Sequence, residues 1–308
     1  MKIIALLPFK NESWILPTYL ESVSKVADHI IALDDTSTDT SRKILENAGV
    51  TVISWPSTDT KVNMSARRNF LLQKGREAGG THFIWLDADE TFSANFVSNG
   101  RKKILSLTPG QKIKMRWIFL WKSNTEYITG NSDYAGLTKD FIVCNSPELS
   151  FENKVLSEGR TPGTDTSSIT LPEEEGVVIH FQFAAWEANQ LKQAWYRCIE
   201  LVNRPNEARA INNMYAITRD SKNILLSQLP IEWLSHIPLP DPTKKSLWQD
   251  TAIRDLFAER GILFFEPLDI WHIPALREMF IVEIGREPRP LVDSRLKKIA
   301  KRIKRLFY

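Results

Sequence analysis

Short apolar runs alternate with segments of helical spacing over residues 1–95 of this 308-residue chain. The runs occupy residues 2–8, 29–33, 50–55 and 82–86 and are rich in Ile, Val and Leu. Strands that are apolar on both sides are typical of a parallel sheet buried between helices. We therefore predict an α/β fold in which helices cover both faces of a parallel sheet.

The remainder of the chain is less regular. Residues 112–122, 141–144 and 177–181 are apolar enough to predict further strands. Residues 184–203 have helical spacing, and residues 221–308 are predicted to be mostly helical, with prolines interrupting the helices. The C-terminal part is therefore expected to be a helical extension of the sheet domain.

The last 15 residues, 294–308, hold seven basic side chains and no acidic one. Leu296, Ile299 and Ile303 recur at intervals of three and four residues, which predicts a basic amphipathic helix. Such a helix can lie on an anionic membrane surface, and the alternative is a solvated helix packed on the protein body. No nucleic-acid partner is predicted, because the basic residues are confined to one end.

Two features of the sequence bear on where the protein works. Cys144 and Cys198 form no Cys-x-x-Cys motif, which argues against a disulfide framework or a thiolate zinc site. The apolar opening of the chain is only about seven residues long, too short for a membrane span or a signal peptide. We expect a cytoplasmic protein that contacts the inner membrane face through its basic tail.

Acidic residues follow the apolar runs, where a parallel sheet binds ligands. Asp87 and Asp89 come directly after the fourth run, so two carboxylates lie close together and repel each other. A bound Mg²⁺ or Mn²⁺ would remove this repulsion, and the alternative is an acidic turn that caps the next segment. Asp34 and Asp35 follow the second run, where a carboxylate can accept hydrogen bonds from a nucleobase or a ribose hydroxyl. The alternative, in which the hydroxyl residues of 37–41 cap the next helix, does not explain two successive aspartates.

Four motifs occur in one order: Pro8-x-Lys10-Asn11-Glu12, Asp34-Asp35-Thr36, Arg67-Arg68-Asn69 and Leu86-Asp87-Ala88-Asp89-Glu90. This order resembles the family-2 glycosyltransferases of the GT-A fold, of the Leu-Asp-Ala-Asp-Glu type. The resemblance implies a GT-A-like nucleotide-binding sheet and a divalent cation, Mn²⁺ or Mg²⁺, held by Asp87, Asp89 and His180. It implies that the nucleotide sugar is bound by Pro8, Lys10, Asn11, Glu12, Asp34, Asp35, Arg68, Asp87 and Ala88.

The chain departs from the family at two positions. Thr36 stands where the family often has Gly, and Leu156 stands where related members often have His. The catalytic base is therefore sought nearby, and Glu158 or Glu152 is our prediction, with Asp133 and Asp165 as open alternatives.

The resemblance implies a metal-dependent inverting glycosyltransferase acting from a nucleoside diphosphate sugar, a UDP-sugar being favoured, on a glycan or glycolipid. Such an enzyme would serve cell-surface polysaccharide biosynthesis. We predict a glycosyltransferase domain over residues 1–230, with a nucleotide-sugar half at 1–95 and an acceptor half at 96–230. Residues 231–308 would form the helical C-terminal extension.

Two other functions fit parts of the sequence. Asp87-Ala88-Asp89-Glu90-Thr91 also resembles the signature of haloacid-dehalogenase-type phosphatases, in which the first Asp is the nucleophile. That signature normally follows the first strand of its domain, whereas here it follows the fourth. The third possibility is a non-catalytic protein that binds a nucleotide sugar.

Overall fold

The computed structural model describes residues 1–56, 63–152, 159–163, 167–218, 223–235 and 237–291. Its strands are β1 (Ile3–Phe9), β2 (His29–Asp34), β3 (Thr51–Ser54), β4 (His82–Ile84), β5 (Glu90–Phe92), β6 (Lys112–Trp121), β7 (Glu126–Gly130), β8 (Thr138–Cys144), β9 (Ser168–Thr170), β10 (Val177–Phe183) and β11 (Leu225–Gln228). Its α-helices are α1 (Leu16–Val23), α2 (Ser41–Asn47), α3 (Met64–Glu77), α4 (Ala94–Leu105), α5 (Trp186–Asn203), α6 (Ala208–Met214), α7 (Gln249–Arg260) and α8 (Pro274–Ile284). Short 3-10 helices are η1 (Ala216–Thr218), η2 (Ile231–Leu234), η3 (Pro242–Lys244) and η4 (Ile262–Phe265).

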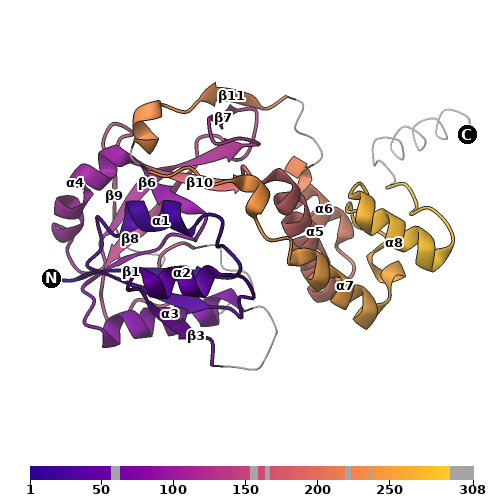
Figure 1. The fold of residues 1–308 in the computed structure, drawn as a ribbon, viewed down its shortest axis with the longest axis horizontal. Coiled ribbons are helices and arrows are strands. Elements are labelled where there is room, and N and C mark those ends of the chain that lie inside the picture. Colours follow the sequence, from indigo (N-terminus) through magenta and orange to yellow (C-terminus); the bar gives the residue numbers. More distant parts are fainter. Residues whose placement is uncertain (57–62, 153–158, 164–166, 219–222, 236, 292–308) are drawn as a thin grey trace, which may run out of the picture. The chain divides into compact units, whose positions relative to one another are not determined.

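The strands form one mixed sheet (Figure 1), in which β3, β2, β1 and β4 are adjacent and parallel in that order. The sheet continues through β8 and β6, each antiparallel to its neighbour. β10 is parallel to β6 and antiparallel to β5. The strand order reverses between β1 and β4, so their carboxyl ends form the topological switch point at which such sheets bind ligands.

Side chains of β1 alternate between two apolar cores, one on each face of the sheet. Ile3, Ala5 and Leu7 belong to the core that contains side chains of α1, α2 and α4. Ile4 and Leu6 belong to the core that contains side chains of α3. Helices therefore cover both faces of the sheet, as the apolar runs predict.

The chain divides into two compact units. Unit 1 comprises Met1–Trp186 and Asn223–Ser246, and unit 2 comprises Glu187–Lys222 and Leu247–Tyr308. Unit 2 has its own apolar core, built from α5, α6, η4, α7 and α8. The chain leaves unit 1 after β10 and returns to it through β11. The predicted domain boundary at residue 230 stays a prediction.

The expectation that residues 221–308 are mostly helical needs one correction. β11 lies in this range and pairs antiparallel with β7. Its sequence, Leu-Leu-Ser-Gln, is short and largely exposed, so it carries little of the apolar pattern that marks a buried strand. The predicted basic helix at residues 294–308 lies outside the described residues. Of the helices that the structure describes, none combines the length and the apolar character required to cross a membrane.

Candidate active site

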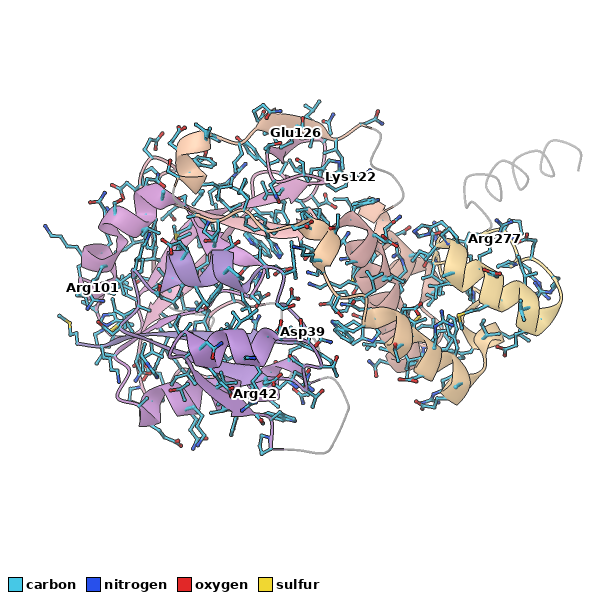
Figure 2. All side chains as sticks on the ribbon, in the orientation of Figure 1. Asp39, Arg42, Arg101, Lys122, Glu126 and Arg277 are labelled. Carbon is cyan, nitrogen blue, oxygen red and sulfur yellow. The ribbon has the colours of Figure 1, made fainter. Side chains whose placement is uncertain are left out.

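Asn11 connects the loops that follow β1 and β2. Its side-chain oxygen accepts hydrogen bonds from the backbone N–H groups of Thr38 (2.7 Å) and Asp39 (3.2 Å). Its φ of 54° lies in the left-handed region, which Asn tolerates better than most residues. Asp39, labelled in Figure 2, accepts hydrogen bonds from the backbone N–H groups of Ser13 and Ser41. These bonds join the two loops into one connected edge beside the switch point.

The two aspartates that follow β2 make contacts within this edge. Asp34 accepts a hydrogen bond from the backbone N–H of Ser37 (2.8 Å), and its other oxygen lies 3.3 Å from the guanidinium of Arg42. Asp35 pairs with Arg67 at 2.9 Å. Asp34 thus stabilises its own turn. Nucleoside binding by Asp34 and Asp35 stays a prediction.

Of the other residues expected to contact the nucleotide, some lie at this edge and some in the apolar core. The ammonium of Lys10 lies 3.4 Å from the hydroxyl of Thr36. Thr36 has a φ of 59°, a conformation that favours glycine, which accounts physically for a glycine preference at this position. Pro8 is half-buried in β1, and Ala88 belongs to the apolar core. Their contacts with a nucleotide also stay predictions.

Charged side chains from several loops gather at the carboxyl ends of β1 and β4. Glu12 follows β1, Asp87 and Asp89 follow β4, and Glu90 begins β5. Most members of the group are buried despite their charge. We call this group the charge cluster; its members are Glu12, Arg68, Asp87, Asp89, Glu90, Arg160, His180 and Lys245.

Two guanidinium groups neutralise one side of the charge cluster. Arg160 contacts both Asp87 and Glu90, and Arg68 lies 3.5 Å from Asp87. Burial alone would raise the pKa of Asp87, but the positive charges of Arg160 and Arg68 hold this pKa below its usual range. Burial and the nearby charge of Asp87 raise the pKa of Glu90 to about 8, although Arg160 opposes the shift. Asp87 is therefore ionised at neutral pH, while the pKa of Glu90 lies well above that of an ordinary carboxyl.

Lys245 and His180 occupy the other side of the charge cluster. The ammonium of Lys245 lies 3.4 Å from Oδ2 of Asp89 and 3.5 Å from Oε2 of Glu12. Nε2 of His180 lies 3.2 Å from Oδ1 of Asp89. The imidazole stacks on Trp117, with ring centroids 5.1 Å apart and planes inclined by 8°. This stacking holds the imidazole against Asp89.

The three predicted metal ligands come together only in part. Asp89 contacts His180, whereas Asp87 contacts Arg160. Within the part of the chain that the structure describes, no three His, Cys, Asp or Glu side chains are placed to hold one metal ion. The oxygens of Asp87 and Asp89 already face the positive charges of Arg160 and Lys245. As arranged, these residues do not fit a divalent cation, and metal binding by them stays a prediction.

The predicted catalytic bases are either exposed or outside the described residues. Glu158 falls outside the described residues, as do Leu156 and Asp165. Glu152 and Asp133 are described, and both are exposed. The role of Glu158 or Glu152 as the base stays a prediction.

Sequence reasoning missed two members of the charge cluster, Arg160 and Lys245. Arg160 lies in a segment rich in Gly, Ser and Pro, and Lys245 follows another lysine near several prolines. Both patterns are typical of solvated loops. Their partners Glu90 and Asp89 lie 70 and 156 residues away in the chain, so no local spacing could reveal the contacts.

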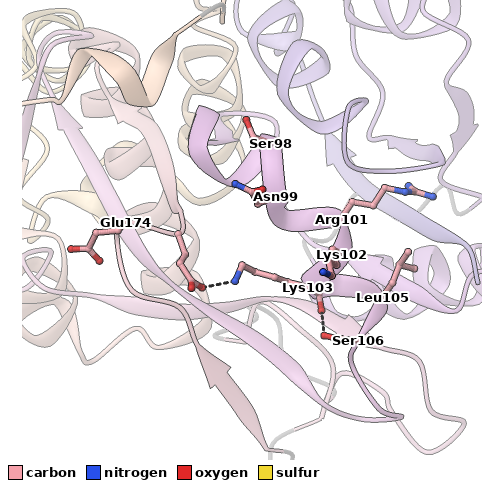
Figure 3. A pocket seen from close by; sticks show the side chains of 9 residues that line it. Ser98, Asn99, Arg101, Lys102, Lys103, Leu105, Ser106 and Glu174 are labelled. Atoms are coloured by element: carbon pink, nitrogen blue, oxygen red, sulfur yellow. Dashed lines mark hydrogen bonds and ion pairs between the residues drawn. The ribbon is translucent and has the colours of Figure 1, made fainter.

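A concave region lies along α4 (Figure 3). This groove of about 1050 Å³ is lined by basic residues of α4 and by Glu174 and Glu175. Lys103 forms an ion pair with Glu175 across it. Arg101, another lining residue, pairs with Asp28, which precedes β2. The groove therefore lies near the amino ends of the parallel strands, at the opposite edge of the sheet from the charge cluster.

Residues 5–108 match the family model described as Glycosyl transferase family 2. The matched segment runs from β1 through α4 and includes Glu12, Asp87 and Asp89. The match confirms the resemblance for this part of the chain; the assignment to the Leu-Asp-Ala-Asp-Glu type stays a prediction. Together with the strand order, it shows the GT-A-like α/β fold expected from the sequence.

Solved structures of low similarity include S. aureus TarS 1-349, with 14% identity, a TM-score of 0.41 and coverage of 95% of both chains. The same protein in complex with UDP-GlcNAc has 15% identity, a TM-score of 0.37 and coverage of 95% of both chains. Mycobacterium tuberculosis glucosyl-3-phosphoglycerate synthase with Mn²⁺ and UDP-glucose has 21% identity and a TM-score of 0.29, covering 38% of this chain and 43% of that chain. Likenesses at these TM-scores establish neither activity nor ligand for this chain. The search of curated proteins gave no match.

Proposed function

We propose that the protein is a glycosyltransferase that moves a sugar from a nucleoside diphosphate sugar to a hydroxyl of a glycan or glycolipid. One observation carries the proposal. Glu12 follows β1 and Asp89 follows β4, and both face the Lys245 ammonium at the switch point of the sheet. Both acidic residues lie in the segment that matches Glycosyl transferase family 2. The carboxyl edge of a parallel sheet is where an α/β fold binds a nucleotide.

The proposed reaction is an inverting displacement. The acceptor oxygen bonds to the anomeric carbon while the bond from that carbon to the diphosphate oxygen breaks. The electron pair of the broken bond leaves with the nucleoside diphosphate, and a carboxylate, Glu158 or Glu152, takes the proton of the acceptor hydroxyl. Negative charge grows on the diphosphate, so cationic groups placed beside it lower the barrier.

We favour a UDP-sugar as the donor and cell-surface polysaccharide as the product. The dependence on Mn²⁺ or Mg²⁺ that the family resemblance implies is a separate prediction, and no step above passes through a metal. Peripheral contact with the inner membrane face through residues 294–308 is likewise a prediction, since these residues are not described. Sedimentation of the full chain and of a chain ending at residue 293 with anionic vesicles would test it.

The function is tested with the purified full chain and a panel of UDP-, GDP-, CDP- and dTDP-sugars, each with Mn²⁺, with Mg²⁺ and with EDTA. Release of nucleoside diphosphate is expected from one of these donors. Asp89→Asn should reduce the rate at least 100-fold, which corresponds to about 2.7 kcal/mol. Glu77→Gln, an exposed change on α3, is the matched control and should keep the wild-type rate.

The same assay separates the alternatives. Binding of a sugar nucleotide with neither transfer nor hydrolysis would support a non-catalytic binding protein. Trapping of an aspartyl-phosphate at Asp87 would support the phosphatase. Asp87 already contacts two guanidinium groups and follows the fourth strand rather than the first, so no structural observation favours that reading.

A further inference from the structure

Lys245 is a buried lysine at the switch point that no motif of the sequence predicts. Its side chain is 3% exposed, although a lysine normally keeps its ammonium in water. The ammonium is enclosed by Asp89 at 3.4 Å, by Glu12 at 3.5 Å and by the face of Trp14, 4.9 Å from the ring centroid. Burial of this charge is tolerated because two carboxylates and an aromatic face surround it.

The lysine reaches this place from a distant part of the chain. Residues 223–246 return to unit 1 after the excursion into unit 2. Besides the pairing of β11 with β7, two hydrogen bonds hold the part of this segment that precedes Lys245: the hydroxyl of Thr18 donates to the carbonyl of Pro238, and the side-chain amide of Asn124 donates to the carbonyl of Pro240. Lys245 is therefore positioned by the returning segment as a whole rather than by a local turn.

The contacts of the ammonium are long for a closed ion pair. Charge-assisted hydrogen bonds between an ammonium and a carboxylate usually measure about 2.7–2.9 Å. Both distances here exceed that range, and an ammonium has three donors. A small shift of Lys245 would let it donate to an additional anionic oxygen without leaving Glu12 or Asp89.

Charge balance indicates which ligand such a site accepts. A diphosphate entering beside Asp87 and Asp89 would be repelled unless positive charge stood nearby. Arg160 and Lys245 place that charge within contact distance of these aspartates. A divalent cation bound to Asp89 would have to compete with the Lys245 ammonium for the same oxygens.

We propose that Lys245 is a donor-binding residue whose ammonium binds the diphosphate of the sugar nucleotide, in the place where the family resemblance puts a divalent cation. This inference rests on the proposed function. It predicts that a nucleoside diphosphate binds to the protein in the absence of divalent metal, and that this binding depends on Lys245.

The test is a binding titration of the full chain with UDP, GDP, CDP, dTDP and ADP in EDTA, repeated with Mn²⁺ and with Mg²⁺. The wild-type protein should bind one of these nucleotides in EDTA. Lys245→Gln should raise the dissociation constant at least tenfold, and Lys245→Arg, which keeps the charge, should stay within about threefold of wild type. Lys244→Gln is the control, because Lys244 is the adjacent lysine and its side chain is 75% exposed.

The outcomes separate this inference from the proposed function. Binding by the wild-type chain only with Mn²⁺ or Mg²⁺ would overturn the role of Lys245 while leaving the glycosyltransferase proposal standing. Equal binding in EDTA by Lys245→Gln and wild type would also overturn the role of Lys245 and leave the glycosyltransferase proposal standing. If no nucleotide binds and no sugar nucleotide is turned over under any condition, the proposed function itself fails. The wild-type comparison between EDTA and metal requires no variant, so binding seen only with metal would overturn the inference even if Lys245→Gln does not fold.

Discussion

The ammonium of Lys245 lies 3.4 Å from Oδ2 of Asp89, although 156 residues separate the two in the chain. Asp89 belongs to the segment that matches a known family, whereas Lys245 lies far beyond the end of that match. The charge balance of the candidate site is thus set partly by the family-like sheet and partly by the returning segment. Variants in both regions are therefore needed to test how the charge balance of the site is set.

Arg160 is expected to be essential for the stability of unit 1. Arg160→Met leaves the buried Glu90 and the half-buried Asp87 without the guanidinium that contacts both. Loss of one partner from a buried ionic group typically costs about 3–5 kcal/mol in the free energy of unfolding. Urea unfolding measures the loss. Arg277→Met, which breaks an exposed ion pair with Glu287, should cost less than about 1 kcal/mol, and equal losses would contradict the expectation.

Asn11 is expected to act through both its side-chain oxygen and its backbone conformation. Asn11→Ala removes the two hydrogen bonds to the loop after β2 and puts a Cβ-bearing residue without a polar side chain at a φ of 54°. We expect a loss of about 2–3 kcal/mol in the free energy of unfolding. Asn11→Gly loses the same hydrogen bonds without the backbone strain, so it should be more stable than Asn11→Ala by about 1 kcal/mol. A glycine variant no more stable than the alanine variant would refute the argument from φ.

Asp39 should make stability depend on pH in the acid range. Burial would raise the pKa of Asp39, but hydrogen bonds from Ser41 and Ser13 outweigh it and lower this pKa. A lowered folded-state pKa contributes stability that is present above the unfolded value of about 3.9 and is lost as pH falls through the folded value. Asp39→Asn should therefore be less stable than wild type at pH 7, by about 1–2 kcal/mol. Urea titrations at pH 7 and pH 3 should show this gap narrowing at pH 3; a gap of constant size would count against it.

Gly75 is expected to be required for the packing of α3 on the sheet. A Cβ at this position would lie 2.7 Å from Cε1 of Phe83 and 3.1 Å from Cδ2 of Leu6, both in fully buried side chains. Replacement of a mid-helix glycine by alanine usually gains about 1 kcal/mol, whereas overpacking a core costs about 1–3 kcal/mol. Gly75→Ala should therefore lower the free energy of unfolding overall. Gln73→Ala, on the exposed side of the same helix, should change it by less than about 0.5 kcal/mol.

The sequence predicts the parallel half of the fold well, because its strands are apolar on both sides. The run at residues 29–33 corresponds to β2 within one residue, and the run at 82–86 contains β4. β7 and β11 were not predicted, since short strands at an exposed edge carry only a weak apolar pattern. The return of residues 223–246 to unit 1 has no signal in the sequence, because it depends on contacts between residues that are distant in the chain.

The sequence predicts only those residues of the candidate site that directly follow a strand. Parallel strands bring Glu12 and Asp89 to one edge, so their convergence follows from the pattern of apolar runs. The sequence cannot distinguish a carboxylate that binds a ligand from one that caps a turn, and Asp34 accepts a hydrogen bond from the backbone of its own turn. Arg160 and Lys245 come from irregular segments, for which spacing rules give no position.

The return of residues 223–246 to unit 1 also fixes the order in which the site is completed on the ribosome. Translation delivers β1 to β10 and then unit 2 residues 187–222, before the returning segment is made. A nascent chain that ends at residue 222 contains Glu12 and Asp89 but has neither Lys245 nor the β11 partner of β7. Maturation of the charge cluster is therefore a late event in biosynthesis, and any uninterrupted fragment that contains all of unit 1 also contains residues 187–222 of unit 2.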